Sequence, residues 1–135
     1  MTITTHSQDE TADVGRRLAS SLQPGSVLLL IGDLGAGKTA LVRGLAEGLG
    51  VQPEDVSSPT FTLMQEYRGG RLPLLDVDLY RLNDSREIDE LGLDELGQEG
   101  VLAIEWAEKL PRSVAGSIEI RIAHGDGDDR QISIA

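Results

Sequence analysis

The chain has 135 residues, which is the length of one domain, and its hydrophobic fraction of 39% is enough for a buried core. Its 23 acidic residues outnumber 12 lysines and arginines, and the net charge of −11 argues against direct binding to nucleic-acid phosphates or to an anionic membrane. The absence of cysteine excludes disulfides, thiol catalysis, zinc–thiolate sites and iron–sulfur clusters.

The sequence contains no pattern typical of a targeting or membrane segment. Its first ten residues, MTITTHSQDE, include no apolar signal core, and no apolar run approaches the roughly 18 residues of a membrane span. We therefore expect a soluble cytoplasmic protein that folds as a single domain over residues 1–135.

The N-terminal part of the sequence predicts a helix. The first structured element is expected to begin at Ser7, which fits a capping box with Glu10. An apolar stripe at a spacing of four follows, formed by Val14, Leu18 and Leu22. The Pro24-Gly25 pair is expected to end this helix.

A buried strand and a second helix come next. Residues 27–31 (VLLLI) are continuously apolar and are closed by Gly32, which is typical of a strand buried on both faces of a parallel sheet. After a glycine-rich turn, a leucine recurs at every fourth position, at Leu41, Leu45 and Leu49. Gly50 then supplies the signal that ends the helix.

The middle of the chain predicts a hairpin followed by an acidic segment. Residues 61–67 and 72–80 are joined by an RGGR turn, which indicates two antiparallel strands. Residues 84–99 hold seven acidic residues and one basic residue, Arg86, and predict one or two short surface helices. This acidic segment is either a solvated face or a docking surface for a basic partner.

The C-terminal part predicts three more strands. Residues 101–105 (VLAIE) form a second fully apolar strand candidate, whereas 117–122 and 130–134 alternate with period two around a polar turn and predict a closing hairpin. Buried strands, helices and hairpins in this order indicate an α/β fold whose sheet has mixed strand directions.

The segment between the first buried strand and the second helix carries a phosphate-binding motif. Residues 32–39 (GDLGAGKT) fit the G-x-x-x-x-G-K-[ST] pattern of a P-loop. Such a loop points successive backbone N–H groups at an anion, and the helix that follows adds its positive end. Lys38 would reach the β- and γ-phosphates, and the Thr39 hydroxyl would ligate Mg²⁺. The remaining nucleotide-binding positions are Asp33, Leu34, Gly35, Ala36 and Gly37.

A P-loop needs an acid that holds or organises Mg²⁺, usually at the end of a neighbouring buried strand. Glu105, at the end of VLAIE, is the first candidate. Asp76 and Asp78 are two residues apart in an alternating stretch, so they share one face of a strand. From the pattern alone, that face is directed either at solvent or at a metal.

Three further residues adjoin the candidate site along the chain. Thr60 follows Pro59 in a segment that is either the start of a strand or a switch that senses the γ-phosphate. Trp106 and Phe61 are each either core residues or ligand contacts, and they follow Glu105 and Thr60 directly.

Four motifs in this order resemble the TsaE (YjeE) family, and the resemblance covers almost the whole chain. The motifs are GDLGAGKT at 32–39, SSPTFTL at 57–63, DVDLYRL at 76–82 and IEWAEKL at 104–110. The second is similar to the family's switch segment, the third to its H-x-D-x-Y-R element and the fourth to its E-W motif. Four ordered motifs are far more specific than a P-loop alone.

The resemblance implies a single-domain P-loop NTPase-like fold, a mixed β-sheet flanked by helices, that binds ATP and Mg²⁺ and hydrolyses ATP weakly by itself. It also implies a complex with TsaD and TsaB, the pair that transfers a threonylcarbamoyl group to adenosine 37 of tRNAs reading ANN codons. In that picture the chain is not the transferase, and its ATP hydrolysis resets the complex between turnovers. Contact with tRNA would fall to the partners.

The resemblance also assigns roles to particular residues. Glu105 and Thr39 would be associated with Mg²⁺, Asp78 would orient the attacking water or the metal shell, and Thr60 would belong to the switch. Lys38 would bind the phosphates, Trp106 would lie at the nucleotide or partner face, and Thr11 and Arg130 would contact the edge of the nucleotide. One departure from the family pattern is Asp76, which stands where a histidine is common, and a second carboxylate so near is expected to raise the pKa of one of the pair.

Two other functions fit a P-loop domain. A small-molecule kinase would need an acceptor pocket and a lid with catalytic arginines, and the arginines after the P-loop form no such cluster in the sequence. A nucleotide-gated interaction module would bind ATP with negligible turnover, and a partner that stimulates hydrolysis would distinguish the ATPase from it.

Overall fold

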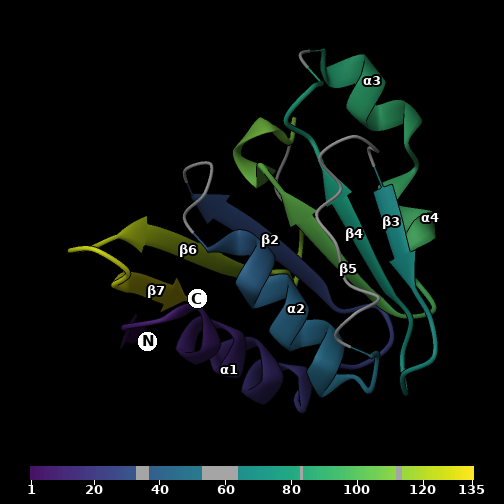
Figure 1. Cartoon of the computed structure of the whole chain (residues 1–135). Helices are drawn as coiled ribbons and strands as arrows, with labels where there is room; N and C mark the ends of the chain where they lie inside the picture. Colours follow the sequence, from purple (N-terminus) through teal and green to yellow (C-terminus); the bar gives the residue numbers. More distant parts are fainter. Residues whose placement is uncertain (33–36, 53–63, 83, 112–113) are drawn as a thin grey trace.

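The structure is a computed structural model that describes residues 1–32, 37–52, 64–82, 84–111 and 114–135 (Figure 1). Within these ranges the strands are β1 (Thr2–Thr5), β2 (Val27–Gly32), β3 (Met64–Tyr67), β4 (Leu74–Asp78), β5 (Val101–Glu105), β6 (Ile118–His124) and β7 (Arg130–Ile134). The helices are α1 (Gln8–Ala19), α2 (Lys38–Gly48), α3 (Ser85–Glu90), α4 (Leu93–Leu96) and the 3₁₀ turn η2 (Ala107–Lys109).

The described strands form one mixed sheet in the order β1-β7-β6-β2-β5-β4-β3. The four central strands, β6, β2, β5 and β4, are parallel, whereas β3, β7 and β1 are antiparallel to their neighbours. The expected α/β class with mixed strand directions is thereby confirmed, and both predicted hairpins are present. Residues 61–63 of the first hairpin lie outside the described ranges.

The N-terminal edge of the sheet differs from the sequence prediction. The first structured element is the strand β1, which precedes Ser7 and pairs antiparallel with β7 from Thr2↔Ser133 to Thr5↔Arg130. Four residues are too few to display a strand period, and their pairing partner lies at the other end of the chain. Its four residues are all β-branched, which favours a strand, but so short a run does not by itself predict one.

Helix α1 begins as expected but ends early. The Ser7 hydroxyl accepts a hydrogen bond from the Glu10 N–H at 3.1 Å, whereas the Glu10 carboxylate accepts from the His6 N–H, so only half of the capping box forms. The helix ends at Ala19 rather than at Pro24-Gly25, although Leu22 is still buried. The hydroxyls of the two serines that follow Ala19 donate back to carbonyls of the last turn, which favours a helix end.

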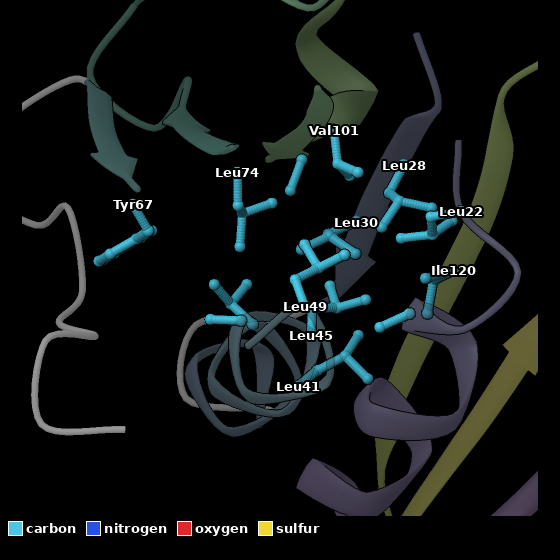
Figure 2. Packing of buried hydrophobic residues seen from close by; sticks show 14 of the residues in the cluster. Leu22, Leu28, Leu30, Leu41, Leu45, Leu49, Tyr67, Leu74, Val101 and Ile120 are labelled. Carbon is cyan, nitrogen blue, oxygen red and sulfur yellow. The ribbon is translucent and has the colours of Figure 1, made fainter. Parts of the chain in front are cut away.

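The main core lies between one face of the sheet and the helices α1 and α2. Figure 2 shows Leu30 of β2 near Leu45 of α2 and near Leu49, the residue that follows α2. It also shows Leu28 of β2 beside Leu22, and all of these side chains are buried. Alternate residues of each parallel strand belong to this face. The same alternation brings the acidic residues at the strand ends to this face.

Glycine permits α1 and α2 to lie in direct backbone contact, side by side in Figure 1. A Cβ added to Gly44 would lie 1.8 Å from the carbonyl oxygen of Ala12, and one added to Gly15 would lie 2.4 Å from that of Leu41. Neither distance admits a side chain. The close contact fixes α2, whose first residue is the P-loop lysine Lys38, against the rest of the domain.

The opposite face of the sheet is covered by shorter elements. The buried residues there include Val77 and Ile104 from the sheet and Ile88 from α3. The acidic segment 84–99 supplies α3 and α4, as predicted. In the described part of the chain, no helix combines the length and apolar character needed to cross a membrane.

Candidate nucleotide-binding site

Acidic and basic side chains meet where the central parallel strands end. In the register of the sheet, Leu30 of β2 pairs with Glu105 of β5, and Glu105 pairs with Asp78 of β4. Paired residues of neighbouring strands point to the same face, so both carboxylates lie on the α2 side. Asp76 shares this face two residues earlier. On this face of the sheet, the side chains are thus apolar along the strands and acidic where the strands end.

Lys38 occupies the first position of α2 and is buried, with 5% of its surface exposed. Its Nζ donates to the carbonyl oxygen of Gly32 at 3.0 Å and lies 4.3 Å from the centroid of the Trp106 ring. The preceding residue, Gly37, has φ 101°, a left-handed conformation that glycine adopts without strain. The order strand, glycine turn and helix predicted for residues 32–39 is found, and residues 33–36 lie outside the described ranges.

Asp76 and Glu105 form a buried pair of carboxyl groups. Asp76 is 1% exposed and Glu105 is 5% exposed, and the two side chains share a hydrogen bond. Burial raises the pKa of Asp76 well above its ordinary value, and Glu105 and then Asp78 raise it further. Burial also raises the pKa of Glu105, while the bond from Asp76 and the charge of Lys38 oppose that shift. Asp76 therefore holds the proton that the pair shares.

The second oxygen of Asp76 has no hydrogen-bond partner among the described residues. The sequence anticipated a raised pKa for one of the two aspartates and attributed it to their proximity. The shift falls on Asp76, and burial is its largest cause, with Asp78 the smallest of the four. An unpartnered oxygen in a buried carboxyl is a group that a cation or a water would satisfy.

Asp78 is half-buried and is held by the backbone that follows it. Its Oδ1 accepts a hydrogen bond from the Tyr80 N–H at 2.8 Å. The face it shares with Asp76 is thus directed at neither bulk solvent nor the apolar core, because it borders Glu105 and α2. This placement favours the metal-facing interpretation of the pair.

Trp106 turns the chain at the edge of the site. It has φ 59°, the one left-handed non-glycine residue in the described part of the chain, and such strain is common at functional sites. Its ring is half-buried, between Lys38 and the exposed Tyr80, whose ring centroid is 5.0 Å away. Lys109 holds the backbone next to the Tyr80 ring, because its Nζ donates to the carbonyl oxygens of Tyr80 at 2.6 Å and Leu82 at 3.1 Å.

Thr11 and Arg130 lie beside the end of the P-loop. A Cβ added to Gly37 would lie 3.7 Å from the Thr11 methyl carbon and 3.8 Å from two atoms of the Arg130 side chain. Thr11 is buried, and its hydroxyl shares a 2.8 Å hydrogen bond with that of Thr5. Arg130 donates to the carbonyl oxygens of Gly127 and Asp129. Residues from both ends of the chain thus meet at the P-loop.

The described residues therefore bring together most of the predicted site. Lys38, Glu105, Asp78 and Trp106 form one group, and Thr11 and Arg130 adjoin Gly37. Thr39 lies next to Lys38 with an exposed side chain. Several predicted positions lie outside the described ranges: Asp33, Leu34, Gly35, Ala36, Thr60 and Phe61.

Sequence reasoning assigned no role to three residues of this region. The Tyr80 ring packs at a tilt against the Trp106 ring, Lys109 holds the backbone around Tyr80, and the Thr5 hydroxyl shares a hydrogen bond with that of Thr11. Lys109 is one of only two lysines in the chain, which is a usable signal. The contacts of Tyr80 and Thr5 depend on tertiary pairing, which no local pattern reports.

The residues present fit a nucleotide with Mg²⁺. Gly37 offers no side-chain cap, so the first N–H groups of α2 are left for an anion, beside the Lys38 charge. Among the described residues, no three acidic or histidine side chains are grouped to hold a metal by themselves. Mg²⁺ is usually bound by one or two carboxylates together with substrate phosphates and water, and Glu105 and Asp78 place two carboxyl groups at this edge of the sheet.

Known proteins resemble this chain over nearly its full length. The family model for "Threonylcarbamoyl adenosine biosynthesis protein TsaE" matches residues 5–132. Proteins named tRNA threonylcarbamoyladenosine biosynthesis protein TsaE are 43% identical in Nostoc sp. (94% of this chain, 80% of the relative) and 45% identical in Bacillus subtilis (93% and 78%). The crystal structure of Bacillus subtilis YdiB, 37% identical, superposes with a TM-score of 0.77 over 99% of this chain and 83% of that one.

Proposed function

The chain belongs to the TsaE family of tRNA threonylcarbamoyladenosine biosynthesis proteins, and from this premise we propose that it is a Mg²⁺-dependent ATPase of that pathway. Its intrinsic hydrolysis is weak and is stimulated in a complex with TsaD and TsaB, where it resets the complex between turnovers. It is not the threonylcarbamoyl transferase, and its place of action is the cytoplasm.

The single observation that carries this proposal is the position of Lys38. Its ammonium group is buried at the N-terminus of α2, within reach of the last carbonyl of β2 and on the same side as Glu105 and Asp78. A buried lysine next to an uncapped helix start is arranged for a polyphosphate, and carboxylates at the neighbouring strand ends are arranged for its metal.

Each residue then has a distinct task. Lys38 would bind the β- and γ-phosphates, and the N–H groups of the first turn of α2 would orient them. Thr39 and Glu105 would hold Mg²⁺, which when bound neutralises charge that develops on the phosphates. Asp78, fixed by the Tyr80 N–H, would orient the attacking water. Thr60 would respond to the γ-phosphate. The side chains of Thr11, Trp106 and Arg130 would lie along the edge of the nucleotide.

The charge of the chain supports the division of labour with its partners. A net charge of −11 is unfavourable for a direct contact with tRNA, so the tRNA is bound by TsaD and TsaB. The acidic chain then takes part through protein contacts and nucleotide turnover.

The proposal is tested by measuring phosphate release by the purified chain alone, with the TsaD–TsaB pair, and with the pair and tRNA. We expect slow release alone and a large increase with the pair. The amount of threonylcarbamoyladenosine formed in the tRNA should exceed one per complex only when this chain and ATP are present. Equal modification without the chain would contradict the proposed role.

Two variants separate binding from hydrolysis. Glu105→Gln and Asp78→Ala should still bind nucleotide, because the N–H groups and Lys38 remain, but partner-stimulated hydrolysis should fall by about 10²-fold or more. Glu119→Gln, on β6 away from the site, is the matched control and should hydrolyse ATP as the wild type does. Wild-type rates in either site variant would remove that residue from the mechanism.

A further inference from the structure

A concave surface lies on the face of the sheet that α1 and α2 leave uncovered. It is a groove with a volume of about 840 Å³. Val27 of β2 and Ile104 of β5 form its floor, and Ile88, Leu93 and Leu110 line its sides. None of these side chains belongs to the nucleotide site, which is on the opposite face of the sheet.

The apolar side chains of the groove stay uncovered because the helices on this face of the sheet are short. Helices α1 and α2 have 12 and 11 residues, whereas α3 and α4 have 6 and 4. Such short helices leave Val27, Leu93 and Leu110 half-buried rather than buried. Apolar side chains that line one concave surface and remain in contact with water are typical of a protein interaction site.

The rim of the groove has a definite charge. Asp89 of α3 and Glu95 of α4 line it, next to the neutral Gln98. They belong to the segment 84–99, which contains seven acidic residues and one arginine. An apolar floor with an acidic rim favours an occupant with apolar side chains flanked by lysine or arginine. It disfavours RNA and a second copy of this chain, which is itself strongly acidic.

We propose that this groove docks a basic amphipathic helix of a partner protein. The apolar face of that helix lies on the floor, and its lysines or arginines lie along the acidic rim, as in other helix-in-groove complexes. The inference rests on the proposed function, in which the chain works within a protein complex, and it adds the surface and the chemistry of one contact.

The groove is connected to the nucleotide site through β5 and η2. Ile104 in the floor directly precedes Glu105, and Leu110 in the wall directly follows η2, whose last residue Lys109 holds the backbone of Tyr80. A docked helix therefore contacts the segment that carries Glu105 and Trp106. Docking at this groove is accordingly a route by which a partner alters ATP hydrolysis.

The test is calorimetric binding of the purified chain to the TsaD–TsaB pair, with charge changes at the rim. Glu95→Lys and Gln98→Lys should each weaken binding by about five- to tenfold, and Gln98→Glu should tighten it about twofold. Glu87→Lys, on α3 but not in the groove, makes the same change of charge as Glu95→Lys and should stay within about twofold of the wild type. ATP affinity and the melting temperature should be unchanged in all four variants.

The outcomes separate the two proposals. If the wild type binds the pair and Glu95→Lys and Gln98→Lys bind equally well, the groove is not the docking site, although the proposed function stands. If Gln98→Lys binds more tightly, or if sedimentation shows dimers of this chain that Glu95→Lys dissociates, the occupant is not basic and the inference is wrong. If the wild type does not bind the pair at all, the proposed function fails, and the inference fails with it.

Discussion

Replacing Asp76 by asparagine should make the folded chain more stable at neutral pH. The Asp76 carboxyl is 1% exposed, and its pKa is raised above the ordinary range, mainly by burial. The folded chain therefore binds a proton that the unfolded chain releases once the pH exceeds about 4. A raised folded-state pKa gives stability that is fully present below the unfolded pKa and is lost as the pH rises through the folded pKa.

The size of this stability difference follows from the titration of the single proton on Asp76. Between the ordinary and the raised pKa, the wild type should lose about 1.4 kcal/mol of stability for each pH unit relative to a chain without this titration. Asparagine cannot ionise, and its amide can still donate to Glu105 as the protonated Asp76 does. At pH 7 we expect Asp76→Asn to exceed the wild type by at least ~1.4 kcal/mol, the effect of a single pH unit between the ordinary and the raised pKa.

The assay is urea unfolding between pH 4.5 and 8 in EDTA, without nucleotide, with Asp128→Asn in the exposed turn before β7 as the control. The curves of wild type and Asp76→Asn should diverge as the pH rises, and Asp128→Asn should follow the wild type. Adding Mg²⁺ with a non-hydrolysable ATP analogue should reduce the divergence, because a cation favours the ionised carboxyl. Parallel curves for Asp76→Asn and wild type would refute the reasoning.

Three further predictions concern the nucleotide site. Lys38→Ala should lower ATP affinity by at least about tenfold in calorimetry, since a charge-assisted contact to phosphate is lost; unchanged affinity would contradict the P-loop assignment. Trp106 fluorescence should change more with Mg²⁺ and an ATP analogue than with ADP, because the Lys38 ammonium lies 4.3 Å from the ring and is drawn to the phosphates; equal signals would show that the ring does not report the γ-phosphate. Gly44→Ala should destabilise the fold by ~3 kcal/mol or more, because its Cβ would lie 1.8 Å from the Ala12 oxygen, and urea unfolding with Arg43→Ala on the exposed face of α2 as the control measures this.

Much of the central fold could be predicted from the sequence because its signals are local. The apolar run at 27–31, the glycine-rich motif after it and the leucines every fourth residue each specify one element through its own period. The helix end at Ala19 was missed, because Pro24-Gly25 is a conspicuous break while serine hydroxyls that bond to the preceding turn are not. Strand β1 was missed because its four β-branched residues are a short and weak signal, and its pairing with β7 joins opposite ends of the chain.

The candidate site was partly predictable for the same reason. Lys38 and Glu105 follow from a motif and from the end of a buried strand. The sequence could not predict that the Asp76 side chain is buried. That face of β4 becomes buried only when β4 pairs with β5 under α2. The contact of Thr11 and Arg130 with Gly37 likewise requires a sheet edge built from both ends of the chain.

The position of β2 in the sheet has a consequence for how the protein forms during synthesis. This strand leads into the P-loop, yet it lies between β5 and β6, which are made about 70 to 90 residues later. A nascent chain that has only just released α2 therefore holds an apolar strand with both edges unpaired, which is the state most exposed to aggregation. The strand gains its first neighbour only with β5 and its second with β6. Folding is thus delayed until most of the chain has left the ribosome, and a chaperone that shields residues 27–32 would act on the nascent chain during that interval.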